Sequence, residues 1–138
     1  MNRQTQRFTV PGPAGLLEVA VDDPADAPRG VALLLHPLPT HGGTMDNKVV
    51  QTLVRAALQL GYRAVRLNFR GVGRSEGVFD HGVGEVEDAL AVAIAQREAG
   101  LPFLLAGFSF GAFVATKVAE RLAADGAAVD RLALVGLA

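Results

Sequence analysis

The chain has 138 residues, half of them hydrophobic, and a formal net charge of −1 from 13 basic and 14 acidic side chains. A domain near this size buries about 70% of the surface of its unfolded chain, so we expect one domain over residues 1–138. Balanced charge argues against a nucleic-acid surface or a polybasic membrane patch. The absence of cysteine excludes disulfides, thiolate metal sites and a cysteine nucleophile. Without an apolar leader or an apolar run of about 18 residues, we expect a cytoplasmic protein that does not contact a membrane.

The N-terminal part of the sequence predicts a β-hairpin. Apolar residues at 8–10 and 16–21 flank a segment at 11–15 whose prolines and glycines suit a turn. An acidic, proline-containing segment at 22–28 follows, and we expect it to be a surface loop.

The remaining sequence alternates short apolar runs with segments of helical period. We expect strands at 31–35, 64–69, 102–106 and 132–135, and helices at 46–60, 85–99 and 110–124. Each helix is followed by a glycine that suits a left-handed C-terminal residue, namely Gly61, Gly100 and Gly126. Nearly unbroken apolar strands are typical of a parallel sheet that helices cover on both faces. The order predicts an α/β fold with a doubly wound, mostly parallel sheet.

The strand at 102–106 runs into the next helix through the pattern G-x-S-x-G at 107–111. In a nucleophile elbow the serine lies at a strained turn, and small residues on either side let the strand and the helix approach closely. Ser109 is therefore the candidate nucleophile. The alternative is a strand-to-helix turn that uses glycine only for its conformation.

A candidate oxyanion loop follows the first core strand and reads H-P-L-P-T-H-G-G at 36–43. An oxyanion hole needs two N–H groups aimed at one point, one of them from the residue after the nucleophile. We expect these to be the backbone amides of Phe110 and Leu38, because Leu38 directly follows the strand and Pro37 has no N–H. Residues 41–43 are the weaker alternative. For His36 and His41 we expect hydrogen bonds to the backbone in preference to a metal site.

Three motifs together resemble the α/β-hydrolase superfamily, and more narrowly the small bacterial predicted hydrolases without a large lid, related to dienelactone hydrolases and serine aminopeptidase-type esterases. They are H-P-L-P-T-H-G-G-T-M-D-N at 36–47, N-F-R-G-V-G-R-S-E-G at 68–77 and A-G-F-S-F-G-A at 106–112. The resemblance implies Ser109 as the nucleophile, with the amides of Leu38 and Phe110 as the oxyanion hole. It also implies a structural loop at 70–75 and hydrolysis of a carboxylic ester or related small acyl compound through an acyl-enzyme. Such chemistry needs no metal or organic cofactor.

The glycines at 71, 73 and 77 allow a second interpretation, a Rossmann-like phosphate cradle for a nucleotide. A dinucleotide loop opens its helix at once, whereas residues 76–84 separate this loop from the next helical segment. For Glu85, Glu87 and Asp88 we expect a role in favouring a helix N-terminus instead of a pair of catalytic carboxylates.

The triad of this fold follows the order Ser, then Asp or Glu, then His, but His36, His41 and His81 all precede Ser109. We do not expect His81 to act as the base. The later acidic residues are expected on an exposed helix face or at the far end of the sheet, and they are Glu120, Asp125 and Asp130. The resemblance therefore implies a hydrolase fold truncated after the sixth strand, without the roughly 60 to 80 residues of two further strand and helix units. It is either the N-terminal part of a serine esterase or a non-catalytic interaction module.

Two expectations concern surfaces. The strand order of the family that the chain resembles implies that the apolar strand at 132–135 lies at a sheet edge without a neighbour. Such edges recruit other chains, so we predict a homodimer through it. An apolar acyl site would be lined by residues around the elbow, for which the candidates are Leu38, Phe79, Phe108 and Phe110.

Overall fold

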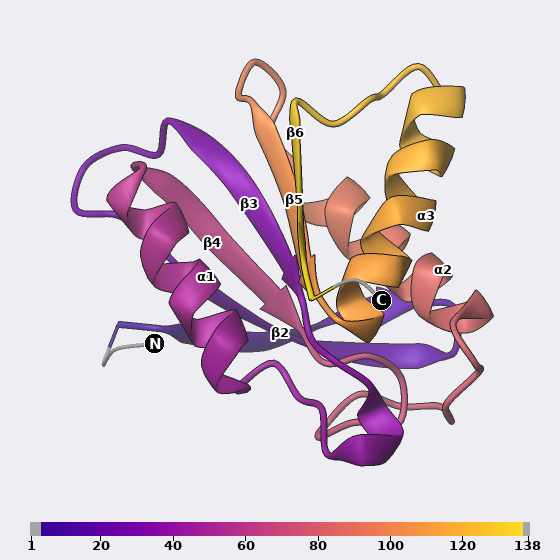
Figure 1. Ribbon diagram of the computed structural model, residues 1–138. Coiled ribbons are helices and arrows are strands. Elements are labelled where there is room, and N and C mark those ends of the chain that lie inside the picture. The colour runs from indigo at the N-terminus through magenta and orange to yellow at the C-terminus, as the bar shows by residue number, and fades with distance from the viewer. Residues whose placement is uncertain (1–3, 137–138) are drawn as a thin grey trace.

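One six-stranded mixed sheet forms the centre of the fold (Figure 1). The structure is a computed structural model and describes residues 4–136. Across the sheet the strand order is β1-β2-β4-β3-β5-β6. The strands are β1 (Gln6–Gly12), β2 (Gly15–Asp22), β3 (Gly30–Leu35), β4 (Tyr62–Leu67), β5 (Phe103–Phe108) and β6 (Arg131–Val135).

The N-terminal hairpin is confirmed, with longer strands than its apolar core indicates. β1 and β2 pair antiparallel from Gln6 with Val21 to Gly12 with Gly15, so residues 13 and 14 alone make the turn. β2 then pairs antiparallel with β4, whereas β4, β3, β5 and β6 are parallel to one another. The predicted mostly parallel sheet is therefore confirmed.

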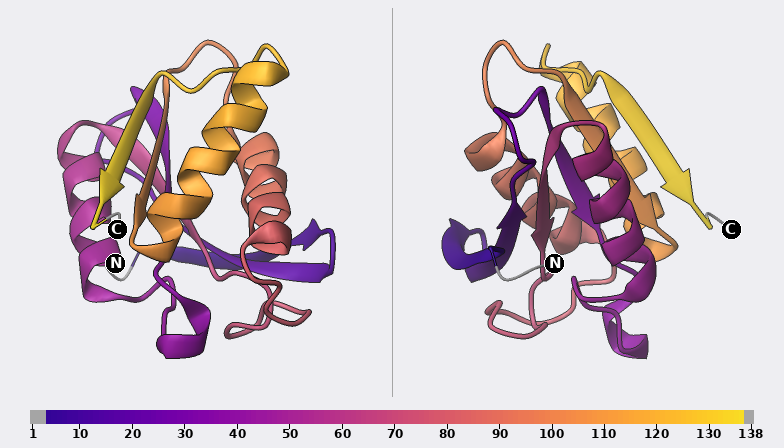
Figure 2. Two further views of the ribbon diagram at one scale, coloured as in Figure 1. Left: turned by 45° about the vertical axis from the view of Figure 1, so that its right-hand side comes forward. Right: turned by 90° about the vertical axis from the view of Figure 1, so that its left-hand side faces the viewer.

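Helices cover both faces of this sheet (Figure 2). α1 (Lys48–Gln59) packs on one face against Ala32, Leu34 and Ala64. α2 (Val83–Gln96) and α3 (Phe110–Ala124) lie together on the other face, which carries the larger apolar cluster. All six residues of β3 are buried, because this strand has a neighbour on each side and a helix layer above and below. Of the described helices, none is long and apolar enough to cross a membrane.

The predicted helix at 85–99 is wrong at both ends. α2 begins at Val83 because the Glu85 carboxylate accepts hydrogen bonds from the backbone N–H groups of Asp80 and Gly82, which fixes the first turn. It ends at Gln96, since Arg97 is extended, with ψ at 137°. Gly100 therefore does not cap α2, although Gly61 and Gly126 do follow the ends of α1 and α3 with positive φ.

Candidate active site

Ser109 lies at the turn between β5 and α3, and its side chain is exposed. Its backbone has φ 57° and ψ −113°, a conformation that residues with a Cβ rarely adopt. The turn is held on both sides, because the Ser109 N–H donates to the Val135 carbonyl (2.8 Å) and the Ser109 carbonyl accepts from Ala112 (2.9 Å). The predicted strained elbow is thus present at this serine.

The two glycines of the motif are required by close backbone contacts. A Cβ on Gly107 would lie 2.2 Å from the carbonyl oxygen of Gly111, so the strand and the helix meet with no room for a side chain. A Cβ on Gly111 would lie 2.2 Å from the carbonyl oxygen of Leu35, at the end of β3. The glycines therefore bring the first turn of α3 against the start of the 36–43 loop.

That loop makes a tight turn after β3 through a short 3-10 helix, η1 (Pro39–His41). The Leu38 carbonyl accepts from the N–H groups of His41 (3.1 Å) and Gly43 (3.0 Å), which closes the turn. Among residues 4–136, the N–H groups of Leu38 and Phe110 donate no hydrogen bond to another protein atom. The absence of a protein partner for these two amides within the described residues is compatible with the oxyanion-hole prediction.

Residues at the end of β4 and directly after it hold the 36–43 loop at its start and just beyond its last residue. At the start of the loop, the Phe69 N–H donates to Nε2 of His36 (3.1 Å). Beyond its last residue, the Met45 N–H donates to Oδ1 of Asn68 (2.8 Å), and the Met45 carbonyl accepts from the Arg66 guanidinium (3.0 Å). The position of Leu38 thus depends on β4 as well as on the strand that it follows.

Arg66 is a buried charge that sequence reasoning missed. It is 1% exposed and forms an ion pair with the equally buried Asp22 (3.4 Å) and a second one with Asp46 (3.2 Å). Partial burial alone would raise the pKa of Asp46, but hydrogen bonds and charge from Arg7 and Arg66 lower it below its ordinary value. Asp46, which directly follows Met45, is therefore held as an anion against Arg66.

His36 is fully buried and bonded to the backbone through both ring nitrogens, as predicted. Nδ1 lies 2.7 Å from the Pro37 carbonyl, and Nε2 accepts from Phe69, so the neutral ring carries its proton on Nδ1. Burial lowers the pKa of His36 to about 4, against the opposing effect of the Pro37 hydrogen bond. His36 is therefore a structural residue and offers no base to Ser109.

The other two histidines are exposed. His41 lies in η1, and the His81 ring packs against Phe79 with ring centroids 4.9 Å apart. Within the described part of the chain neither makes a hydrogen bond to Ser109, and no cluster of metal-binding side chains is found there. The later acidic residues lie as predicted: Glu120 and Asp125 are exposed, and Asp130 accepts from the Phe103 N–H at the start of β5, the end remote from Ser109.

The loop after β4 is held by its own contacts and does not form a phosphate cradle. The Glu18 carboxylate accepts from Nδ2 of Asn68 and from the Arg74 N–H, both at 2.9 Å, and the Ser75 hydroxyl donates to the Asn68 carbonyl (2.6 Å). The Glu18 carboxylate of β2, which is bound against this loop, opposes the binding of a phosphate there. The nucleotide interpretation therefore has no support in the structure.

Arg70, the third residue after β4, forms an ion pair with Asp88 of α2 (2.8 Å). Its guanidinium also donates to the Gly84 carbonyl. Asp88 and Glu85 thus anchor the start of α2 and are not paired with each other. Residues 70–75 form a structural loop, as the family resemblance implies.

Phe110 is the centre of an aromatic cluster beside the elbow. Its ring lies 5.8 Å from Phe69, 5.9 Å from Phe79 and 6.5 Å from Phe113. Phe108 lies apart from this group, next to Gly136 after β6. Of the candidate lining residues, Phe79 and Phe110 are thus brought together and Phe108 is not.

Comparison with known proteins identifies the family. The sequence model described as thioesterase domain matches residues 61–138, more than half of the chain. The chain belongs to the thioesterase domain family. A curated, uncharacterized protein of Rickettsia prowazekii is 42% identical over 113 residues, which are 80% of this chain and 48% of that protein.

Solved structures place this thioesterase domain family member in the α/β-hydrolase superfamily. An α/β serine hydrolase homologue from Coxiella burnetii is 46% identical with a TM-score of 0.78, over 86% of this chain and 58% of that one. A member of the α/β serine hydrolases without lid from Xanthomonas campestris is 43% identical with a TM-score of 0.79, over 89% and 59%. The predicted superfamily is thereby confirmed, and the chain spans about half the length of the curated relative and less than three fifths of these two structures.

Proposed function

We propose that this chain carries the nucleophile and the oxyanion hole of a serine hydrolase that cleaves a carboxylic ester or a thioester. The observation that carries the proposal is the backbone of Ser109, strained at φ 57° with an exposed side chain between two glycines that have no room for a Cβ. Such strain costs about 1 to 3 kcal/mol and clusters at active sites. The match to the thioesterase domain and the similarity to α/β serine hydrolases support this class of reaction.

In the proposed reaction Ser109 Oγ attacks the carbonyl carbon while its proton passes to a general base. The carbonyl electron pair moves onto oxygen, and the N–H groups of Leu38 and Phe110 bind the resulting anion. Each such donor contributes a factor of about 10² to 10³ in turnover. The intermediate then expels the thiolate or alkoxide, which takes the proton from the base, and a water molecule hydrolyses the acyl-enzyme by the same steps.

The general base is not among the histidines of the described residues. His36 is buried and bonded to the backbone, and His41 and His81 make no hydrogen bond to Ser109. The chain spans only 58% and 59% of the two solved relatives. We propose that the base and its orienting acid belong to a longer natural polypeptide, outside residues 1–138.

A fluorophosphonate probe tests the nucleophile in the natural polypeptide that contains these residues. We expect labelling that Ser109→Ala abolishes, with a loss of turnover on the order of 10⁶. Thr116→Ala removes a hydroxyl from α3, the helix that Ser109 precedes. The Thr116 hydroxyl donates to the Ala112 carbonyl, and the variant serves as the matched control that still labels. Labelling that persists in Ser109→Ala rules the assignment out. A folded natural polypeptide that never labels would instead favour the non-catalytic interaction module.

A further inference from the structure

Arg66 places a buried charge between the sheet and α1. It lies on β4 two residues after Ala64, which packs against α1, and alternate residues of a strand face the same side. The Arg66 side chain is 1% exposed, and its Nε has no hydrogen-bond partner among residues 4–136. The guanidinium is therefore only partly satisfied, which disfavours the folded state.

The ion pair between Arg66 and Asp22 does not explain why a charge is buried here. Two buried charges lose their hydration on folding, and a well-packed apolar pair of similar volume is often equally stable or more stable. The distance of 3.4 Å between the two side chains is also longer than that of a strong charge-assisted hydrogen bond. Stability therefore does not account for Arg66, and its remaining contacts point to another role.

The remaining contacts of Arg66 are with the segment that follows the 36–43 loop. Its guanidinium donates to the Met45 carbonyl (3.0 Å) and to the Asp46 carboxylate (3.2 Å). Arg7 donates to the same carboxylate from the exposed side of the molecule (2.9 Å). The chain is thus fixed to β4 two residues after the loop ends.

Gly43, the last residue of the loop, connects this anchor to the candidate oxyanion amide. A Cβ on Gly43 would lie 2.1 Å from the Pro37 carbonyl oxygen and 2.7 Å from the Leu38 carbonyl oxygen. The Pro37 carbonyl and the Leu38 N–H belong to one planar peptide group, so a contact that fixes the carbonyl also fixes the N–H. The Gly43 N–H donates to the Leu38 carbonyl (3.0 Å), which keeps the two segments together. A displacement of Met45 is therefore passed on to the Leu38 N–H through only two residues.

We propose that Arg66 is a positioning residue: by bonding the Met45 carbonyl, it holds the 36–43 loop where the Leu38 N–H can bind the oxyanion. This inference rests on the proposed function. Arg66 touches no substrate atom and acts only through the loop. A misplacement of about 1 Å in a catalytic group can cost about 10² in rate, so a small movement of the loop is sufficient. Turnover therefore depends on the bond to Met45 and not on the ion pair with Asp22.

Two variants of the natural polypeptide separate the bond to Met45 from the ion pair. Arg66→Met combined with Asp22→Leu replaces both buried charges by apolar side chains, so we expect thermal unfolding at the same or a higher temperature. In this double variant kcat for an acetyl thioester should fall at least tenfold with KM unchanged, because the oxyanion contact forms only in the transition state. Asp22→Asn keeps the contacts of Arg66 with Met45 and Asp46, so it should unfold at a lower temperature but keep kcat within twofold. An unchanged kcat in the folded double variant, or an equal loss of kcat in Asp22→Asn, would overturn the proposal.

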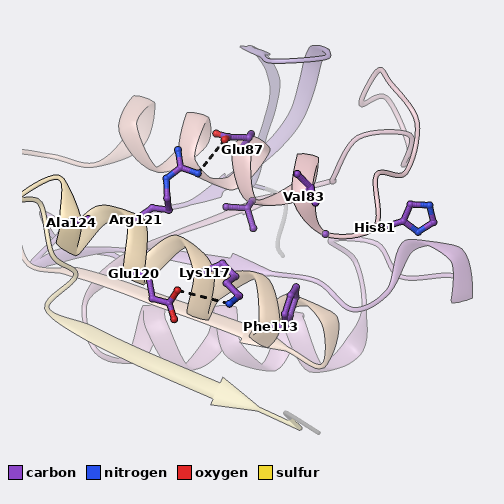
Figure 3. Close-up of a pocket in the computed structure, with 10 residues that line it drawn as sticks. His81, Val83, Glu87, Phe113, Lys117, Glu120, Arg121 and Ala124 are labelled. Carbon is purple, nitrogen blue, oxygen red and sulfur yellow. Dashed lines mark hydrogen bonds and ion pairs between the residues drawn. The ribbon is translucent and has the colours of Figure 1, made fainter.

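An exposed ion pair provides the matched control. Arg121 of α3 and Glu87 of α2 lie 3.2 Å apart beside the groove between these helices, on the face of the sheet opposite to α1 (Figure 3). Arg121→Met makes the same chemical change as Arg66→Met and should leave kcat unchanged. A loss of kcat in Arg121→Met as large as that in the double variant would contradict a specific role for Arg66.

Arg66→Lys keeps the test decisive if the double variant does not fold. The ammonium keeps a charge opposite Asp22, but it lacks the planar fork that bonds the Met45 carbonyl and two carboxylates at once. We expect Arg66→Lys to lower kcat at least fivefold with KM unchanged. A folded Arg66→Lys with the kcat of the unmodified polypeptide would overturn the proposal.

Amide NMR signals separate this inference from the proposed function, because they need no turnover. In the double variant we expect the signals of the Leu38 and Gly43 N–H groups to shift, while those of α3 stay in place. Unmoved Leu38 and Gly43 signals would overturn the positioning role alone. If the natural polypeptide hydrolyses no thioester and the fluorophosphonate does not label Ser109, the proposed function fails, and the NMR comparison still decides whether Arg66 positions the loop.

Discussion

Asn68 joins three segments that surround the candidate site. Its Oδ1 accepts from the N–H of Met45, two residues after the oxyanion loop, and its Nδ2 donates to the Glu18 carboxylate of β2. Its backbone carbonyl accepts from the Ser75 hydroxyl of the loop after β4. Because Asn68 is only 4% exposed, water cannot easily replace these partners when the side chain is removed.

We predict that Asn68→Ala lowers the free energy of unfolding by about 2 to 4 kcal/mol, since it leaves a buried N–H and a buried carboxylate short of partners. Urea denaturation measures the change. Asn47→Ala is the matched control, because Asn47 accepts from the N–H groups of Val49 and Val50 at the start of α1, and loss of such a cap costs about 1 kcal/mol. Equal losses of unfolding free energy in the two variants would contradict the prediction, because loss of the Asn68 contacts would then cost no more than loss of a helix cap.

His36 predicts a pH dependence of stability. The unfolded chain binds a proton near pH 6.5 and the folded chain near pH 4, so the unfolded state holds more protons between these values. The stability that the neutral ring provides is fully present above pH 6.5 and is lost as the pH falls toward 4. The shift corresponds to a loss of about 2 to 3 kcal/mol between pH 7.5 and pH 4.5.

The measurement is urea denaturation of the unmodified chain and of His36→Gln at these two pH values. Gln keeps an acceptor for the Phe69 N–H but does not titrate, so the free energy of unfolding of the variant should fall by about 2 to 3 kcal/mol less over the same interval. Parallel pH profiles would contradict a depressed pKa for His36. The comparison holds even if His36→Gln is less stable at both pH values, because the readout is how much the free energy of unfolding changes between them.

At the scale of elements, the two ends of α3 differ in why they contain glycine. Gly111, in its first turn, faces the backbone carbonyls of Leu35 and His36, where a Cβ would be 2.2 Å and 2.7 Å from the oxygens. Gly126, after its last turn, has φ 76° and nothing within 4 Å of where its Cβ would lie. The first glycine is needed for space and the second only for its conformation.

We therefore predict that Gly111→Ala costs more than about 3 kcal/mol, because two backbone segments must separate. Gly126→Ala should cost only about 1 kcal/mol, the usual penalty for a side chain in the left-handed region. Thermal unfolding of the two variants measures both. A small loss in Gly111→Ala would mean that α3 can move away from β3 at little cost, which the proposed oxyanion hole does not allow.

The strands and the elbow were predictable because their signals are local. Apolar runs located β3 to β6, and the G-x-S-x-G spacing located the turn at Ser109. The start of α2 was placed two residues late, since the Glu85 side chain reaches back to Gly82, a contact that apolar periodicity does not report. The predicted end of α2 was wrong for a related reason. Arg97 lies outside the helix, and its side chain donates to the carbonyls of Ala127 and Ala128, which are far away in sequence.

The buried polar network behind the oxyanion loop was not predictable. Glu18, Asn68 and Ser75 meet only because β2 pairs with β4 in a register that puts Val19 opposite Leu67. Arg66 and Asp22 pair across the same two strands. Nothing in the spacing of these residues along the chain indicates that register, because it depends on how the hairpin packs against the parallel strands.

At the scale of the whole molecule, β6 is one of the two edge strands of the sheet within residues 4–136, and β1 is the other. β6 pairs with β5 alone, and Leu132 and Leu134 are 41% and 38% exposed. An exposed apolar edge offers unpaired backbone groups to another strand. For the polypeptide of residues 1–138 we propose that the occupant is β6 of a second copy, in a symmetric pair.

Sedimentation velocity at tens of micromolar tests this pairing. We predict a dimer for residues 1–138 that Leu134→Lys converts to a monomer, because a charge on an edge strand opposes further pairing. Leu60→Lys, at a side chain that is 54% exposed after the end of α1, should leave the dimer intact. A monomer in the unmodified chain would rule the pairing out.

The strand order also has a consequence for synthesis on the ribosome. β3 is the most buried strand, yet one of its two neighbours, β5, is translated roughly 70 residues later. At about 5 to 20 residues per second, β5 is translated roughly 4 to 14 s after β3. Throughout this interval one edge of an entirely apolar strand has no partner, so the nascent chain presents a binding site for chaperones until β5 emerges.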